Sequence, residues 1–170
     1  MNTGESLFSI GALLLLSLTV LRVNNTILTT DSTLIDSKLG LLATSLGTSI
    51  IEEANKKAFD ANTVGNPITD LSLLTAPGGL GPGAGESSPE TFNDFDDFNG
   101  YTRHYTEAEI PAASFDLRCE VCYVTPTNVD GKSFSKTWHK KITVYVTSPF
   151  INGGQDTVTF SSVYSYWFFR

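Results

Sequence analysis

Residues 5–21 read ESLFSIGALLLLSLTVL, which is one acidic residue followed by sixteen residues without a charge. A segment that is apolar on all sides is typical of a helix in lipid or among other helices, and not of a surface helix. As a helix, sixteen residues rise about 24 Å, which is short of the roughly 30 Å hydrocarbon core of a bilayer. The segment would therefore span a membrane only with help from flanking residues.

A cleaved signal peptide is the simplest alternative for such a segment. However, no Lys or Arg precedes the apolar run, whereas a signal peptide begins with a basic region. No small-residue cleavage site follows it either, because the chain continues as Leu21-Arg22-Val23-Asn24-Asn25. We therefore expect this segment to be retained as the first part of a longer helix.

The apolar pattern continues after residue 25 but becomes restricted to one face. Apolar residues recur there at steps of three, four and seven, which is typical of an amphipathic helix. No proline precedes Pro67, so we expect one helix over residues 4–58, about 80 Å long. Residues 24–33 are rich in Asn and Thr, which are weak helix formers, so we expect bending or unwinding there or near Gly11. The residues of the apolar stripe are Leu28, Ile35, Leu39, Leu42, Leu46 and Ile50.

The C-terminal part of the sequence predicts an antiparallel sheet. Residues 114–125 and 134–147 alternate between apolar and polar side chains, as strands with one buried face do. Asp130-Gly131 between them is a strong hairpin signal, and residues 157–168 predict a further strand. We expect an α+β fold in which the amphipathic half of the long N-terminal helix packs on an antiparallel meander of three to four strands.

These patterns divide the chain into four segments. Residues 1–25 form a hydrophobic helix, and residues 26–58 form the amphipathic half of the same helix. Residues 59–113 are a connecting loop that is rich in Gly and Pro and then acidic. Residues 114–170 form the sheet.

Two motifs in the connecting loop suggest binding chemistry. Residues 75–86 are rich in Gly and Pro, but no Lys-Ser or Lys-Thr follows and no strand precedes them, so phosphate binding is not favoured. Residues 92–101 read FNDFDDFNGY and cluster the oxygen ligands that Ca²⁺ prefers. Because their spacing is not that of an EF-hand, we favour a structural turn whose aromatic residues anchor an acidic loop, with calcium binding as the alternative. The candidate calcium ligands are Asp94, Asp96, Asp97 and Asn99.

Composition and the two cysteines narrow the possible functions further. The net charge is −7, with only 11 Lys and Arg residues, which argues against a nucleic-acid partner because phosphate binding needs clustered cations. Cys119 and Cys122 lie three apart in a predicted strand and so point to opposite faces, which disfavours a disulfide or a shared metal. His104 and His139 lack the spacing of zinc ligands. We therefore expect no enzyme activity and no cofactor.

Glu5 followed by an unbroken apolar helix is the pattern of processed type IV pilins and pseudopilins, and the chain resembles that family. In this family a basic leader is removed and the new first residue is N-methylated, which would place Met1 at mature position one. The resemblance implies that the Glu5 carboxylate pairs with the N-terminal amine of Met1 in a neighbouring subunit. A buried ion pair of this kind sets register rather than adding net stability. The commonest members begin with Phe and have a proline near position 22, whereas this chain has Met1 and Arg22, so the usual helix kink is not implied.

Two further segments are similar to pilin-like proteins of Gram-negative bacteria. Residues 96–101 read DDFNGY and resemble a segment that lies between helix and sheet in those proteins. Residues 142–147 read ITVYVT and resemble one of their strands.

The resemblance implies a structural major subunit of a type IV pilus-like extracellular filament on the cell surface, with adhesion or motility as its use. Residues 1–25 would anchor the protein in the inner membrane before assembly and would form the filament core afterwards. The expected partners are copies of the chain itself, the inner membrane and the pilus assembly machinery. Alternatives are a minor pseudopilin of a type II secretion-like machine, a membrane-anchored adhesin or calcium-binding module, and an enzyme with a signal peptide. The expected core-packing residues are Leu7, Phe8, Ile10, Gly11, Leu14, Leu18 and Leu21.

Overall fold

The computed structural model describes residues 3–111, 113–151, 154 and 156–166. The chain begins with one long helix, α1 (Thr3–Asn55), and the later residues form a sheet. Contacts divide the chain into two compact units, with the boundary between Lys38 and Leu39. We call residues 39–170 the head and describe the two units separately. The strands are β1 (Thr102–Tyr105), β2 (Phe115–Tyr123), β3 (His139–Thr147) and β4 (Thr157–Ser165).

α1 is continuous through the segment in which unwinding was expected. Hydroxyl groups there donate to backbone carbonyls one turn earlier, as Thr30 Oγ1 does to Thr26 O and Thr33 Oγ1 to Thr29 O, both at 2.8 Å. Because these hydroxyls find partners inside the helix, the Thr-rich run remains helical despite its low propensity. The expected unwinding in residues 24–33 or near Gly11 is therefore wrong.

The helix ends at Asn55, slightly before the predicted end at residue 58. Ala58 N–H donates to Asn93 O at 3.2 Å, and Phe95 N–H donates to Ala58 O at 2.8 Å. This pairing with a segment far away in the sequence takes Ala58 out of the helix. A long-range contact of this kind has no local signal.

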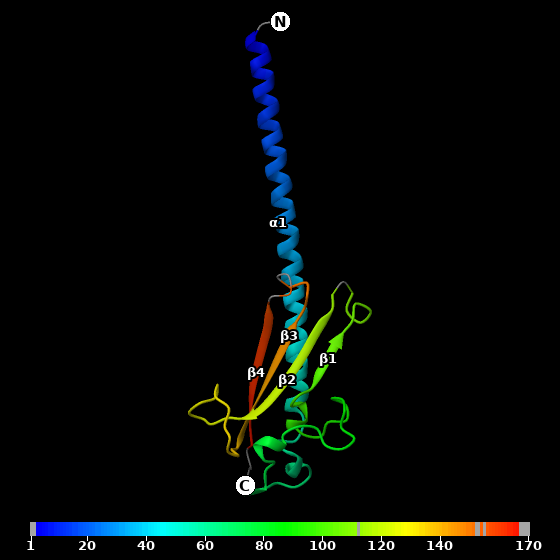
Figure 1. Ribbon diagram of the computed structural model, residues 1–170, viewed down its shortest axis with the longest axis vertical. Helices are drawn as coiled ribbons and strands as arrows, with labels where there is room; N and C mark the ends of the chain where they lie inside the picture. The colour runs from blue at the N-terminus through cyan, green and yellow to red at the C-terminus, as the bar shows by residue number, and fades with distance from the viewer. Residues whose placement is uncertain (1–2, 112, 152–153, 155, 167–170) are drawn as a thin grey trace. The chain divides into compact units, whose positions relative to one another are not determined.

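The four strands lie side by side in the order β1-β2-β3-β4, and each neighbouring pair is antiparallel (Figure 1). This confirms the predicted α+β arrangement of a long helix and an antiparallel meander. In β2, Leu117 and Cys119 are buried whereas Arg118 between them is exposed. Cys119 lies opposite Val144 of β3, which is also buried, so the two strands share one apolar face.

The part of α1 inside the head packs on this apolar face. Its buried residues recur at steps of four and three, which places them on one side of the helix. Several are small and allow the helix backbone to approach the strands closely. A Cβ added at Gly47 would overlap the ring of Phe160 in β4. The buried helix residues are Leu39, Ala43, Gly47, Ile50 and Ala54.

The predicted start of the second strand and its tight hairpin are wrong. β3 begins at His139, and residues 124–138 form a longer connection. Ser133 N–H donates to Tyr123 O at 2.7 Å, and Thr137 Oγ1 donates to Val124 O at 2.7 Å. Hydrogen bonds to the end of β2 therefore hold this connection. They take the place of the strand-to-strand hydrogen bonds that a hairpin with a tight Asp-Gly turn would have formed.

The two edges of the sheet also differ from the prediction. β1 is a short strand in the segment that was predicted as loop, and three of its four residues are exposed, which leaves no clear alternation in the sequence. β4 ends at Ser165, before the predicted end at residue 168. Residues 167–170 lie outside the described residues.

Residues 59–113 fold back onto the head and contribute to its core. Phe92, Phe95 and Phe98 are buried, as the interpretation of a structural turn predicted. The rings of Phe92 and Phe98 lie edge to face with centroids 4.9 Å apart, and Tyr101 packs edge-on against Phe92 at 5.6 Å. The aromatic residues thus fix the acidic loop to the core.

Candidate functional site

The first unit is an apolar helix whose large side chains are exposed in a single copy of the chain. Leu7 is 73% exposed and Phe8 is 85% exposed. Among the described residues, α1 is the one helix that is long and apolar enough to cross a membrane. Exposed apolar surfaces of this extent are typical of sites that contact lipid or another protein. The other large residues that were expected to pack in a core are exposed too, namely Ile10, Leu14, Leu18 and Leu21.

Small residues form a shallow groove on this helix. A Cβ at Gly4 or Gly11 would meet no other atom within 4 Å. Small residues on one helix face allow a second helix to approach closely in an apolar environment. The groove is lined by Gly4, Leu7, Phe8, Gly11, Ala12 and Leu15.

Glu5 lies in the first turn of α1 and is exposed. A negative charge is favourable there because the N-terminal end of a helix carries a partial positive charge. Its backbone oxygen accepts a hydrogen bond from Ser9 Oγ at 2.9 Å. Met1 lies outside the described residues, so the pairing of Glu5 with the Met1 amine of another copy stays a prediction.

The acidic candidates for calcium binding use their oxygens for bonds within the loop. Asp97 Oδ2 accepts from the backbone N–H groups of Asn93 at 2.9 Å and Asp94 at 3.1 Å. Asp94 Oδ1 accepts from the N–H of Asp96 at 2.8 Å. Within the described part of the chain, no group of three His, Cys, Asp or Glu side chains is placed to hold a metal ion.

Asn99, the fourth calcium candidate, connects the loop to the sheet. Its Nδ2 donates to Leu80 O at 2.9 Å, and its Oδ1 accepts from Val121 N–H at 3.0 Å. Both ends of the amide therefore hold the loop against the sheet, as in the interpretation of a structural turn.

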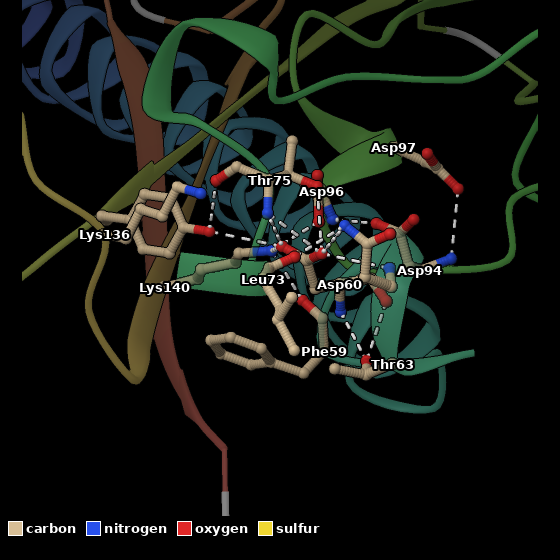
Figure 2. A network of polar contacts seen from close by, with 12 residues as sticks. Phe59, Asp60, Thr63, Leu73, Thr75, Asp94, Asp96, Asp97, Lys136 and Lys140 are labelled. Atoms are coloured by element: carbon tan, nitrogen blue, oxygen red, sulfur yellow. Dashed lines mark hydrogen bonds and ion pairs between the residues drawn. The ribbon is translucent and has the colours of Figure 1, made fainter. Parts of the chain in front are cut away.

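A lysine is buried beneath this loop. Lys140 lies on the apolar face of β3, and its side chain is 0% exposed. Its Nζ donates to Phe59 O at 2.8 Å, to Asp60 Oδ2 at 2.8 Å and to Asp96 Oδ1 at 2.5 Å (Figure 2). The three donor positions of the ammonium group are therefore all in use. Both carboxylates are buried as well. We call Lys140, Asp60 and Asp96 the buried ion cluster.

Asp60 is held by several further donors. Thr75 donates to its carboxylate through both the backbone N–H and Oγ1, each at 3.0 Å in its shortest contact. Asn62 N–H donates at 3.1 Å, and the hydroxyl oxygen of Tyr123 lies 3.3 Å from Oδ2. Burial acts to raise the pKa of Asp60, but the Lys140 ammonium and the backbone donors outweigh it, so the pKa lies below the ordinary value of 3.8.

The pKa values of Asp94 and Asp97 are shifted in the opposite direction, above the ordinary value. Burial, the hydrogen bond with Asp96 and the neighbouring negative charges raise the pKa of Asp94 to about 9. Asp94 is therefore a neutral carboxylic acid at neutral pH. Burial also raises the pKa of Asp97, although two backbone N–H donors partly oppose it.

The sequence analysis did not identify Lys140 or Asp60. The alternation of Val146, Val144 and Ile142 continues back to Lys140, so a lysine on the apolar face of a strand was the available signal. Such a lysine needs an anionic partner when it is buried. The partner Asp60 is 80 residues away in the sequence, and no local pattern connects the two.

Both cysteines are buried and free. Cys119 packs in the core between Leu117 and Val121 of β2, as expected for a small core residue. Burial raises the pKa of its thiol to about 12, and burial also raises the pKa of Cys122. The thiolate is the reactive form, so both groups are poor nucleophiles at neutral pH.

Comparisons of the chain with protein-family models, with curated proteins and with solved structures find no match.

Proposed function

We propose that this chain is the structural subunit of an extracellular filament of the type IV pilin kind, built by bundling the N-terminal helices of many copies. The observation that carries the proposal is the apolar surface of α1, where Leu7 and Phe8 are more than two-thirds exposed. A bundle of identical helices would cover this surface, and a membrane would cover it before assembly.

The organisation of the head supports this proposal. The head has its own core, in which α1 residues such as Ala43 and Ala54 are fully buried against the sheet and loop. Among the described residues, every buried side-chain polar atom has a hydrogen-bond partner. The head is therefore complete as a folded unit, and the large uncovered apolar surface belongs to the N-terminal helix.

The polar groups of that helix also suit an apolar environment. Ser9 Oγ donates to Glu5 O at 2.9 Å, and Thr19 Oγ1 donates to Leu15 O at 2.8 Å. A hydroxyl that is bonded inside its own helix can enter lipid or a helix bundle without leaving a donor unpaired. Within residues 5–21 the charged group is Glu5, and in the proposed filament it pairs with the N-terminal amine of a neighbouring copy.

The proposal is tested by electron microscopy of material sheared from cells that express the full chain. We expect filaments that contain this protein, and we expect Glu5→Gln to abolish them or to reduce their number strongly. Glu52→Gln is the matched control, because it makes the same change at an exposed position in the last turns of α1 and should leave assembly normal. Normal filaments from Glu5→Gln would contradict the pairing role.

Determination of the N-terminal residue of the cell-derived protein distinguishes the proposal from a secreted enzyme. A filament subunit keeps the apolar segment, whereas a signal peptide is removed with it. A native protein that begins after Leu21 would overturn the proposal. A protein that keeps the segment but stays monomeric and membrane-bound would favour an anchored binding module.

A further inference from the structure

The buried ion cluster places an amine and two carboxyl groups in direct contact inside an aromatic enclosure. Lys140 Nζ lies 2.5 Å from Asp96 Oδ1 and 2.8 Å from Asp60 Oδ2. The same nitrogen lies 4.6 Å from the ring centroid of Phe59 and 5.3 Å from that of Tyr123. We propose that Lys140 and Asp96 condense to an intramolecular amide, an isopeptide bond that the folded head forms by itself.

The other bonds of the two carboxylates identify Asp96 as the group that reacts. Amide formation removes one carboxyl oxygen as water. Both oxygens of Asp60 accept from donors other than Lys140, because Asn62 N–H and Thr75 Oγ1 donate to Oδ1 and Thr75 N–H donates to Oδ2. Loss of Asp60 Oδ1 would leave Asn62 N–H without this acceptor, and loss of Oδ2 would remove the shorter of the two bonds from Thr75 N–H, each at a cost in stability. Asp96 Oδ1 accepts from Lys140 itself, so its loss leaves no other donor of the cluster unpaired.

The reaction balances within the cluster. A proton passes from the Lys140 ammonium to the Asp96 carboxylate, which gives a free amine and a carboxylic acid. The amine nitrogen attacks Cγ of Asp96, and a C–N bond forms. A second proton leaves the nitrogen, and one carboxyl oxygen departs with two protons as water. One positive and one negative charge disappear together, so the net charge of the cluster does not change, and no oxidant or other reactant is needed.

Two neighbouring carboxyl groups are placed to move these protons. Asp60 contacts the amine directly and can accept the second proton from nitrogen. Asp94 Oδ1 accepts from the backbone N–H of Asp96 at 2.8 Å, which holds the Asp94 carboxyl beside Asp96, and its raised pKa keeps it in the acid form that can protonate the departing oxygen. General acid and base catalysis requires groups at hydrogen-bond distance from the atoms that gain and lose protons. Asp60 meets this requirement at the nitrogen, and Asp94 lies within hydrogen-bond distance of Asp96.

Burial favours the condensed product. The side chains of Lys140 and Asp60 are 0% exposed, and that of Asp96 is 2% exposed. Taking two charges out of water is costly, and an amide removes both charges. Water that is released from the site has little access back to it, so hydrolysis of the amide is slow. The bond would join the loop before β1 to β3, two segments that are 44 residues apart in the sequence. This proposal does not depend on the proposed function.

The test is peptide mass spectrometry of the full wild-type chain, purified in detergent, denatured and digested with trypsin. Trypsin cuts after Lys and Arg, so the unlinked chain gives a peptide of residues 58–103 and cuts after Lys140. We expect instead one branched species that contains residues 58–103 and 137–141, with a mass lower than the sum of the two peptides by one water. Fragmentation should place the link at Asp96. Folded wild-type protein that yields only the unlinked peptides would overturn the proposal, and so would a link at Asp60.

Two lysine variants provide the controls. Lys140→Arg should give the full mass without a branched peptide, because the guanidinium group does not condense. Lys141→Arg changes the adjacent lysine, which faces Asp130 and lies outside the cluster, and should still lose one water. A water loss that persists in Lys140→Arg would overturn the assignment. The wild-type measurement stands even if Lys140→Arg fails to fold.

The proton-transfer role of Asp94 is tested by the rate of link formation after cell-free synthesis of the full chain. Asp94→Asn keeps an acceptor for the Asp96 N–H but cannot supply the proton. We expect formation to slow by about 100-fold, the lower end of general acid and base contributions. An unchanged rate would overturn the role of Asp94.

Discussion

Gly47 of α1 lies directly beneath the ring of Phe160 in β4, so close that any Cβ at position 47 would overlap ring atoms. Phe160 lies opposite Val144 of β3, which is fully buried. The separation of helix and sheet within the head is therefore set by the absence of a side chain at one helix position.

Gly47→Ala should destabilise the head by about 1–3 kcal/mol, because the added methyl must displace the Phe160 ring or the helix. Gly40→Ala is the matched control on the same helix, where a Cβ meets nothing within 4 Å. It should stabilise by up to about 1 kcal/mol, since Ala is the better helix former. Urea unfolding of both variants measures the difference. Equal effects at the two positions would show that the contact with Phe160 does not limit packing.

The stability of the head should fall as pH rises through the neutral range. The pKa of Asp94 is about 9 in the folded chain, whereas an ordinary Asp, as in the unfolded chain, has a pKa of 3.8. At a pH between these two values, the folded chain therefore keeps a proton on Asp94 that the unfolded chain releases. Unfolding is then favoured by higher pH, by at most about 1.4 kcal/mol per pH unit for this group. In the range from about pH 5 to about pH 8, the unfolding free energy of Asp94→Asn should change less steeply with pH than that of the wild type. A slope identical to that of the wild type would contradict the assignment.

Neither cysteine should react in the folded protein at neutral pH. The pKa of Cys119 is raised to about 12 by burial, and that of Cys122 is raised for the same reason, so thiolate is scarce at both sites. Alkylation with iodoacetamide, followed by mass spectrometry, should label the native chain slowly and the urea-unfolded chain at both positions. Labelling of native Cys119 as fast as in the unfolded chain would contradict its place in the core.

Tyr123→Phe should destabilise the head by about 1 kcal/mol. The Tyr123 hydroxyl donates to Thr75 O at 2.8 Å and contacts Asp60 Oδ2 at 3.3 Å, so its removal leaves a partly buried carbonyl without that donor. Tyr145→Phe is the control, because Tyr145 is on the opposite face of the sheet, with Arg118 over its ring. It should change stability by less than about 0.5 kcal/mol. Thermal unfolding of the two variants compares them, and an equal loss would count against a role for the buried hydroxyl.

The sequence predicted those parts of the fold that repeat with a local period. The helical period of the stripe through Leu39 and Ile50 and the alternation around Val144 were sufficient for α1, β2, β3 and the antiparallel order. What it did not predict depends on contacts between distant segments. The end of α1 is set by the pairing of Ala58 with Asn93, and the connection before β3 is set by its bonds to the end of β2.

The apolar face of the N-terminal helix could be read directly from residues 5–21, because a run without charges needs no partner in the sequence to be recognised. The buried ion cluster could not be recognised from the sequence. Alternation alone places Lys140 on the apolar face, but its partners Asp60 and Asp96 belong to a loop whose path is fixed by Phe92 and Phe98. Only the folded loop brings these charges together.

Asp60, Asp96 and Lys140 enter the chain at widely separated points, and the lysine comes last. A polypeptide that is cut short before β3 would hold two inward-facing acids with no cation to neutralise them, and its loop could not close over the sheet. The loop over the sheet therefore becomes electrically balanced only when synthesis has passed residue 140.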